Sequence, residues 1–121
     1  MSMIDTPGIR ALSRFLDIAV FRNSLIGSNM ANIDTPNYRA VDVNFRQELE
    51  RAGGSEMQLA SMSPLVRRVQ GLTERPDGNN VSLEREGLVL SENQLRFTTA
   101  VQLLRAEFHR LSVAIHEGST S

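Results

Sequence analysis

Apolar and small side chains recur along residues 8–33 at alternating spacings of three and four positions. The row comprises Ile9, Leu12, Leu16, Ala19, Asn23, Ile26, Met30 and Ile33. This spacing places the whole row on one stripe of an α-helix that packs along a partner helix. Asn23 is its polar member, and it either fixes the register with that partner or reaches water at the edge of the stripe.

Residues 82–116 carry a second row with the same alternation of spacings. Its members are Leu83, Gly87, Leu90, Gln94, Phe97, Val101, Leu104, Phe108, Leu111 and Ile115. A helix of this length spans roughly 50 Å. Because Gly87 and Gln94 weaken the first half of the row, we expect the firmest packing from Phe97 onward.

Residues that begin or end helices flank both rows. Asp5 or Thr6 is placed to cap the first helix, with Pro7 in its first turn. Ser82 is placed to cap the second helix, and Gly118 is a stop signal after it.

The connection between the rows begins with a turn, Asp34-Thr35-Pro36-Asn37. We expect Pro36 to end the first helix, because proline cannot continue one. Proline favours the first central position of such a turn, and Asn37 tolerates the left-handed conformation at the next.

Short elements are expected within residues 38–80. The alternation of Tyr38, Ala40, Val41, Val43 and Phe45 suits an extended segment, 47–51 a helical turn before Gly53-Gly54, and 65–69 a short strand. Residues 53–80 lack sustained periodicity, and such long connections are uncommon inside compact domains. We therefore expect this part either to be disordered alone or to be ordered by a partner.

The pattern predicts a mainly α protein in which two long terminal helices form an antiparallel coiled-coil pair. A long irregular or extended connection with minor β structure joins them. The single domain divides into residues 1–35, 36–80 and 81–121. One helix pair covers only one stripe of each helix, and apolar side chains such as Phe21 lie off the stripe. The leftover apolar surface marks an interaction site, so an assembly subunit or a helix-binding module is expected.

Composition narrows the function classes. The formal net charge is −1, which gives no strong field for nucleic acid or an anionic membrane. Cysteine is absent, which excludes disulfides and thiol catalysis. The sequence start lacks the basic and apolar regions of a cleavable signal peptide, and no apolar run approaches the roughly 20 residues of a membrane span. Taken alone, these features indicate a cytosolic protein.

Candidate chemical sites have weak support. His109 and His116 are seven residues apart on the second helix, a rise of roughly 10 Å that is too long for one metal ion. Asp42, Glu48 and Glu50 have no nucleophile, base or metal ligand near them in sequence. We therefore expect no enzyme activity, no metal and no cofactor.

Two stretches carry a resemblance to a known family. Asn29-Met30-Ala31-Asn32-Ile33-Asp34-Thr35-Pro36-Asn37-Tyr38 resembles the signature that ends the N-terminal helix of flagellar axial proteins. Its continuation to Phe45, together with residues 77–84, resembles the FlgB family of proximal rod proteins of the bacterial flagellar basal body. Asn37 stands where that family usually has glycine.

This resemblance implies a structural subunit whose terminal helices pack around the rod channel and transmit torque. Implied partners are copies of the chain, other rod proteins, the rod adapter protein and the MS-ring protein. The resemblance also implies type III export without a cleavable signal peptide, and a place in the periplasmic rod. It thereby replaces the cytosolic interpretation. The alternative from another class is a cytoplasmic helical adaptor or regulator that binds one partner helix.

Four polar or aromatic residues near the first connection are further interface candidates. Asn32 is expected to cap the first helix, with a contact to another subunit as an added role. Asn29 either caps locally or reaches a neighbouring subunit. Tyr38 and Phe45 are expected to dock against a neighbour or against the chain's own helical core.

Overall fold

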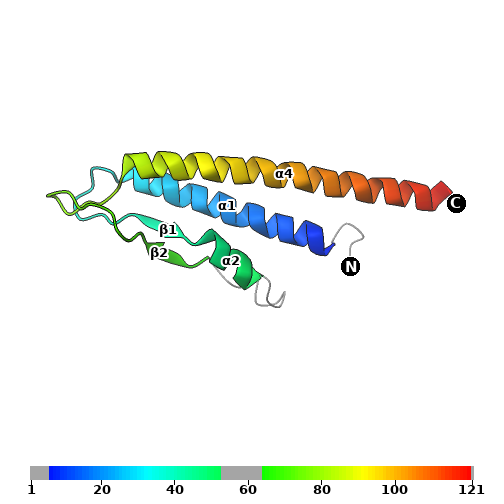
Figure 1. The fold of residues 1–121 in the computed structure, drawn as a ribbon, viewed down its shortest axis with the longest axis horizontal. Coiled ribbons are helices and arrows are strands. Elements are labelled where there is room, and N and C mark those ends of the chain that lie inside the picture. The colour runs from blue at the N-terminus through cyan, green and yellow to red at the C-terminus, as the bar shows by residue number, and fades with distance from the viewer. Residues whose placement is uncertain (1–5, 53–63, 121) are drawn as a thin grey trace.

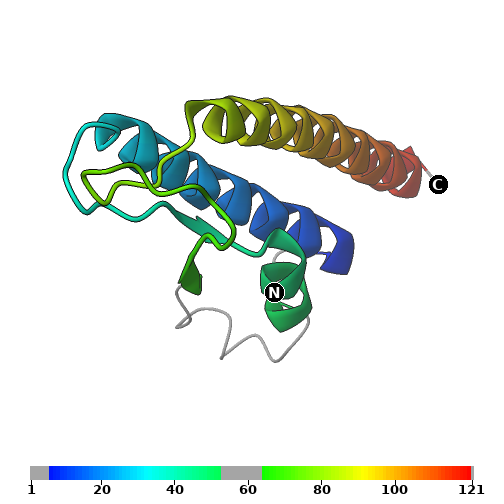
Figure 2. The same ribbon diagram turned by 60° about the vertical axis from the view of Figure 1, so that its left-hand side comes forward.

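A computed structural model of the chain describes residues 6–52 and 64–120. The elements follow in the order α1 (Pro7–Ala31), β1 (Val41–Val43), α2 (Phe45–Ala52), β2 (Val66–Arg68) and α4 (Leu83–Thr120). Helix α1 lies in the middle, with α4 along one side and β1, β2 and α2 along the other (Figure 1). Figure 2 shows the same three layers from another direction. The fold is thus mainly helical, as the sequence predicts.

The predicted caps form at the starts of both long helices. The Thr6 hydroxyl accepts a hydrogen bond from the Ile9 N–H at 3.1 Å, and Pro7 occupies the first turn. The Ser82 hydroxyl accepts from the Arg85 N–H at 3.2 Å. Asp5, the other candidate cap, lies outside the described residues.

The prediction that Gly118 stops the second helix is wrong, because α4 continues to Thr120. Gly118 is not among the described glycines with a positive φ, whereas a glycine that ends a helix usually adopts that conformation.

Helix α1 ends at Ala31, before Pro36, so the prediction that Pro36 ends it is wrong. Asn32 supplies the cap: its side-chain N–H donates to the Ser28 carbonyl at 2.8 Å, and its backbone N–H donates to the same oxygen at 3.1 Å. The expected capping role of Asn32 is confirmed. A cap of this kind ends the helix without a proline because it satisfies a carbonyl left free in the last turn.

Pro36 sits instead in a tight turn that the Tyr38 N–H closes by donating to the Thr35 carbonyl at 3.2 Å. Asn37 has φ 63°, so its predicted left-handed conformation is confirmed. A second turn packs against this one: the Asn37 N–H donates to the Asp77 carbonyl at 2.9 Å. Gly78 has φ 85°, and a Cβ atom there would overlap the Asn37 side-chain oxygen.

The expected strands and short helix are present. Strands β1 and β2 pair antiparallel, with Val41 opposite Arg68 and Val43 opposite Val66, and α2 covers the expected helical turn. Residues 64–80 are ordered by the chain itself. The Val69 N–H, for example, donates to the Ala40 carbonyl at 2.9 Å. For this part the expectation of disorder or of ordering by a partner is wrong, and residues 53–63, including Gly53-Gly54, lie outside the described residues.

The main apolar cluster lies between α1 and the β1–α2 segment. It is built from Ile18, Ala19, Val43 and Phe45. The Phe45 ring meets Phe15 edge to face with centroids 4.6 Å apart, and the Arg96 guanidinium lies 4.7 Å from its centroid. Phe45 therefore docks against the chain's own core, which is one of the two roles that were left open for it.

The two long helices run in opposite directions. Asn29, near the end of α1, donates to Glu86 at the start of α4, and Asn93 donates to the Ala19 carbonyl farther along. Figure 1 accordingly shows the start of α1 beside the second half of α4. Whether the pair is a true coiled coil, with side chains interlocking layer by layer, remains a prediction.

The face of α4 that meets α1 differs from the predicted row. Its buried members are Glu86, Val89, Asn93 and Ala100, whereas Leu83, Leu90 and Phe97 are exposed. The row of largest burial is thus displaced by one position, a rotation of about 100°. These buried residues lie between positions 86 and 100, in the N-terminal half of α4. The expectation of firmest packing from Phe97 onward is therefore wrong.

Among the described helices, none combines enough length and apolarity to cross a membrane.

Candidate assembly interface

A buried asparagine ties three segments together near the end of α1. The Asn29 side-chain N–H groups donate to the Val41 carbonyl at 2.8 Å and to Glu86 at 3.0 Å. Its side-chain oxygen accepts from the Val41 N–H at 3.0 Å and from the Tyr38 hydroxyl at 3.2 Å. All four hydrogen-bonding positions of the amide are occupied within the chain. Asn29 is therefore an internal clamp, and Tyr38 is held by it.

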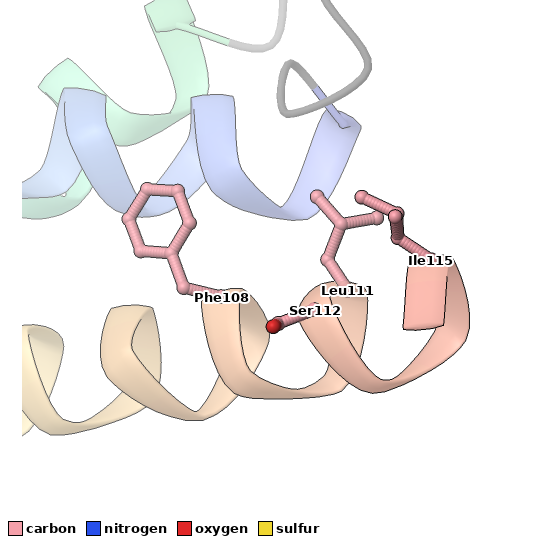
Figure 3. A pocket seen from close by; sticks show the side chains of 4 residues that line it. All are labelled: Phe108, Leu111, Ser112 and Ile115. Carbon is pink, nitrogen blue, oxygen red and sulfur yellow. The ribbon is translucent and has the colours of Figure 1, made fainter. Parts of the chain in front are cut away.

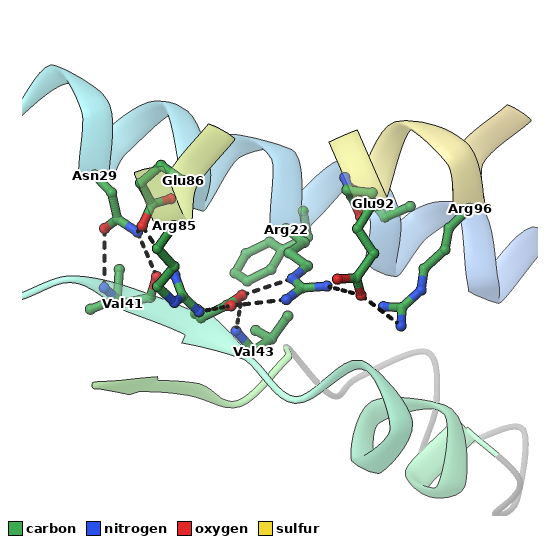
Figure 4. A network of polar contacts seen from close by, with 12 residues as sticks. Arg22, Asn29, Val41, Val43, Arg85, Glu86, Glu92 and Arg96 are labelled. Atoms are coloured by element: carbon green, nitrogen blue, oxygen red, sulfur yellow. Dashed lines mark hydrogen bonds and ion pairs between the residues drawn. The ribbon is translucent and has the colours of Figure 1, made fainter. Parts of the chain in front are cut away.

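Asp42 on β1 joins α1 to α4 through two arginines. These arginines, Arg22 and Arg85, are labelled in Figure 4. Arg22 of α1 binds both carboxylate oxygens, with Nε 2.9 Å from Oδ1 and Nη2 3.0 Å from Oδ2. Arg85 of α4 adds a third contact, with Nη2 2.7 Å from Oδ2. The bidentate geometry fixes the angle between strand and helix as well as their distance.

Burial alone would raise the pKa of Asp42. The hydrogen bonds from Arg22 and Arg85, with the charge of Arg22 and the Val43 N–H, outweigh burial and hold the pKa of Asp42 below its ordinary value. Asp42 is therefore a stable anion at neutral pH, and it is the acid that Arg22 and Arg85 share.

Glu86 is the fully buried acid of the same cluster. One of its oxygens accepts from Asn29 and from Arg85 at 3.0 Å, whereas Oε2 has no hydrogen-bond partner among the described residues. Burial raises the pKa of Glu86 above its ordinary value, although Arg85 and Asn29 oppose that rise. Two neighbouring carboxyl groups thus have pKa values displaced in opposite directions.

The connection is fastened to the end of α1 by a second set of contacts. The Asn79 side-chain N–H groups donate to the carbonyls of Asn32 and Thr35, both at 2.8 Å. The Asn80 side-chain oxygen accepts from the Ala40 N–H at 2.7 Å. These amides satisfy carbonyl and N–H groups of the turn that no helix or strand pairs. The connection is consequently held to the end of α1 by side-chain hydrogen bonds.

Apolar side chains remain uncovered on more than one side of α4. The exposed ones are Leu83, Leu88, Leu90, Leu95, Phe97, Leu103, Phe108, Val113 and Ile115. Phe108, Leu111, Ser112 and Ile115 line a hollow beside the N-terminal end of α1 (Figure 3). A helix that is apolar on several faces is normally enclosed by neighbours.

The predicted interface residues fall into three groups by burial. Those largely covered within the chain are Ile9, Ile26, Asn29 and Phe45. Those partly covered are Leu12, Leu16, Asn32, Ile33, Tyr38, Val101, Leu104 and Leu111. Those left exposed are Asn23, Met30, Pro36, Phe97, Phe108 and Ile115. The exposed and partly covered groups are the ones available to a neighbour.

Sequence reasoning missed the buried charges. Arg22 lies four residues from Ile18 and four from Ile26, on the same face of the helix as these apolar residues. A cation in the middle of an apolar face indicates that a buried acid pairs with it. The acids weighed as a catalytic pair are bound separately: Asp42 by Arg22 and Arg85, Glu48 by Arg51 at 2.8 Å, and Glu50 by Arg46 at 3.6 Å. No cluster able to hold a metal ion occurs among the described residues.

Comparison with known proteins places the chain in a family. No model of a known protein family matches it. It is 35% identical over 105 residues to the flagellar basal body rod protein FlgB of Cereibacter sphaeroides, covering 78% of this chain and 82% of that protein. The chain belongs to the FlgB family. The FlgB of Borrelia hermsii is 31% identical over 124 residues, and that of Salmonella typhimurium is 26% identical over 130 residues.

The resemblance seen in the two sequence stretches is thereby confirmed. FlgB is named as a basal body rod protein in each of these bacteria, and none of the names describes a catalytic activity. The FlgB-family chain is accordingly a structural protein of the flagellar basal-body rod.

Proposed function

We propose that this chain is a subunit of the proximal rod, which assembles with copies of itself and with other axial proteins. In this role it connects the MS ring to the distal rod and transmits torque. The observation that carries the proposal is the apolar surface of α4, which α1 covers on one side only. Membership of the FlgB family supports the same role.

The mechanism we propose is mechanical. The interlocking helices act as a coiled coil, and the rows of α1 and α4 that stay uncovered pack against neighbouring subunits. Resistance to shear comes from many apolar layers that must separate together. The cluster of Asp42, Arg22 and Arg85 holds β1 on the helix pair, so load on one element is passed to the other.

The neighbours and route that we propose follow from the family. They are the rod adapter protein, the MS-ring protein and the next rod protein, reached by type III export into the periplasm without a cleaved signal peptide. Two features of the described residues support such a place: apolar helix faces that stay uncovered, and a connection that hydrogen bonds hold to one end of the helix pair.

Fractionation of cells tests the proposal against a cytoplasmic adaptor. A rod subunit copurifies with basal bodies, whereas an adaptor for one partner helix stays in the soluble fraction. We expect the chain in basal bodies, and its confinement to the soluble fraction would reject the rod assignment.

Two substitutions test the helix faces in the same assay. Leu104→Asp is expected to remove the chain from basal bodies and to abolish motility, and Ile26→Asp to do the same by disrupting the packing within the chain, because Ile26 is buried there. A charge in an apolar layer costs several kcal/mol unless it reaches water. Glu50→Asp, on an exposed position of α2, is the control. A motile strain that carries either aspartate variant would argue strongly against the mechanism.

A further inference from the structure

The chain exposes more surface than a compact protein of its size. Its accessible surface is 8110 Å² for a mass of 13.5 kDa. A compact monomer of that mass exposes about 6,500 Å². The excess of about 1,600 Å² reflects the elongated shape of the helix pair, which leaves long faces of both helices open.

A row on α4 points away from α1. Leu88 and Leu95 are both 69% exposed and lie seven residues apart, so they share one face of the helix. They stand half a turn away from Glu86 and Asn93, which are buried against α1. Nothing in the described part of the chain covers this face, which we call the back row.

A receiving groove lies between α1 and α4. Val20, Asn23, Asn93, Gln94 and Phe97 line a hollow there together with Ala19. Val20 is 58% exposed, although it is apolar. One heptad along α1, Gly27 is exposed, and a side-chain carbon added to it would meet nothing within 4 Å. The groove is uncharged and open, with the apolar side chains of Ala19, Val20 and Phe97 beside the amides of Asn23, Asn93 and Gln94.

The back row and the groove lie at the same height along the helix pair. Asn29 is level with Glu86, and Gly8 is level with Glu107, because these residues approach each other across the pair. The same register sets Leu95 level with Val20 and Leu88 level with Gly27. A second copy, rotated about an axis parallel to the helices, therefore brings its back row to the mouth of the groove without sliding along it.

We propose that the occupant of the groove is the back row of a second copy of this chain, with Leu95 of one copy seated against Val20 and Phe97 of the next. This proposal rests on the proposed rod function and names the contact that builds the assembly. The two surfaces differ, so the contact is head-to-tail, and it continues around a ring or along a helix and does not stop at a dimer. Each copy then uses two faces, the back row and the groove.

Engineered thiols test this contact directly, because the chain has no cysteine of its own. The full-length protein carrying Leu95→Cys and Val20→Cys is produced in cells, basal bodies are isolated, and the thiols are oxidised. Products are detected with an antibody to the chain on non-reducing gels. Leu95 points away from its own α1, so a bond between the two positions joins different copies.

We expect the double variant to give trimers and larger multimers, while each single variant stays monomeric. Leu95→Cys combined with Arg46→Cys is the matched control, since the Arg46 side chain on α2 is 90% exposed, and it should give no multimers. Leu88→Cys with Gly27→Cys is a second pair that tests the same register at another height.

The outcomes separate the two proposals. If the chain is found in basal bodies and neither double variant yields multimers, the contact is refuted and the rod function stands. A dimer from Leu95→Cys alone would also refute it, because the back rows would then face each other. If the chain is absent from basal bodies, the rod function fails and the contact fails with it.

Discussion

At the residue scale, the cluster around Asp42 and Glu86 places charges where a small protein would ordinarily bury apolar groups. A buried ion pair adds little net stability compared with a well-packed apolar pair, but the loss of one partner leaves a costly charge behind. Arg22 has Asp42 and, at 3.7 Å, Glu92 as partners, and Arg85 has Asp42 and Glu86. The cluster therefore specifies how β1 sits on the helices more than it adds stability.

Asp42→Asn removes the shared anion of the two arginines. We expect a loss of about 3–5 kcal/mol in the free energy of unfolding at pH 7, as for other broken buried pairs. The pKa of Asp42 is lowered in the folded chain, so its contribution is present above the ordinary value of 3.8 and disappears as the pH falls through the lowered value. Urea unfolding at pH 7 and at pH 3 measures the difference.

The deficit of Asp42→Asn should accordingly shrink in acid. Asp17→Asn, at an exposed position of α1, is the control and should change little at either pH. A deficit that is equally large at both pH values would mean that Asp42 acts by its shape and not by its charge.

Glu86→Gln should show the opposite pH dependence. The pKa of Glu86 is raised in the folded chain, so its contribution is fully present below the ordinary value of 4.5 and is lost as the pH rises through the raised value. The free energy of unfolding of the glutamine variant, relative to the natural chain, should therefore increase between pH 4 and pH 7. Glu84→Gln, exposed in the first turn of α4, serves as the comparison. A relative stability that falls over this range would refute the assignment.

At the element scale, the sequence predicted the two long helices, their start caps, the turn at Asn37 and the three short elements between them. It misplaced the face of α4, because the residues buried against α1 include Glu86 and Asn93. A prediction from periodicity assumes that the buried face of a helix is apolar. This assumption fails for α4, because Asn29 and the Ala19 carbonyl form hydrogen bonds with the buried side chains of Glu86 and Asn93. Those partners lie far away in sequence, so no local pattern shows them.

Two adjacent residues of α4 test which face belongs to which partner. Val89 is buried against α1, and Leu90 is exposed. Val89→Asp should therefore lower the helical circular dichroism signal of the purified chain, because a buried charge disrupts the pair. Leu90→Asp should leave that signal intact and reduce incorporation into basal bodies. Equal effects of both substitutions on the purified chain would show that the assignment of Val89 to the buried face and of Leu90 to the exposed face is wrong.

At the scale of the whole molecule, the two long helices are unequal partners. Helix α4 has 38 residues and α1 has 25, so their lengths are about 57 Å and about 37 Å. The final turns of α4 therefore project beyond the start of α1 (Figure 1). Most of the stability of a helix in a protein comes from packing against other elements, so we expect the turns of α4 beyond α1 to be less stable than the part packed along it.

Amide hydrogen exchange should reveal this inequality. In the purified chain, residues 112–118 are expected to exchange much faster than residues 86–100, which face α1. In isolated basal bodies the same C-terminal residues should become protected as neighbours cover them. Unchanged exchange of residues 112–118 on assembly would show that the projecting part of α4 is not an interface.

The turns at Asn37 and Gly78 pack so closely that the residues allowed at one position depend on the residue at the other. While asparagine occupies position 37, a Cβ atom at 78 would overlap its side-chain oxygen and lie 3.2 Å from its Cα, so we expect substitution of Gly78 to be costly. Glycine at position 37 would remove the obstructing side chain and open position 78 to residues such as asparagine that tolerate its backbone. Related chains should therefore vary at these two positions in concert.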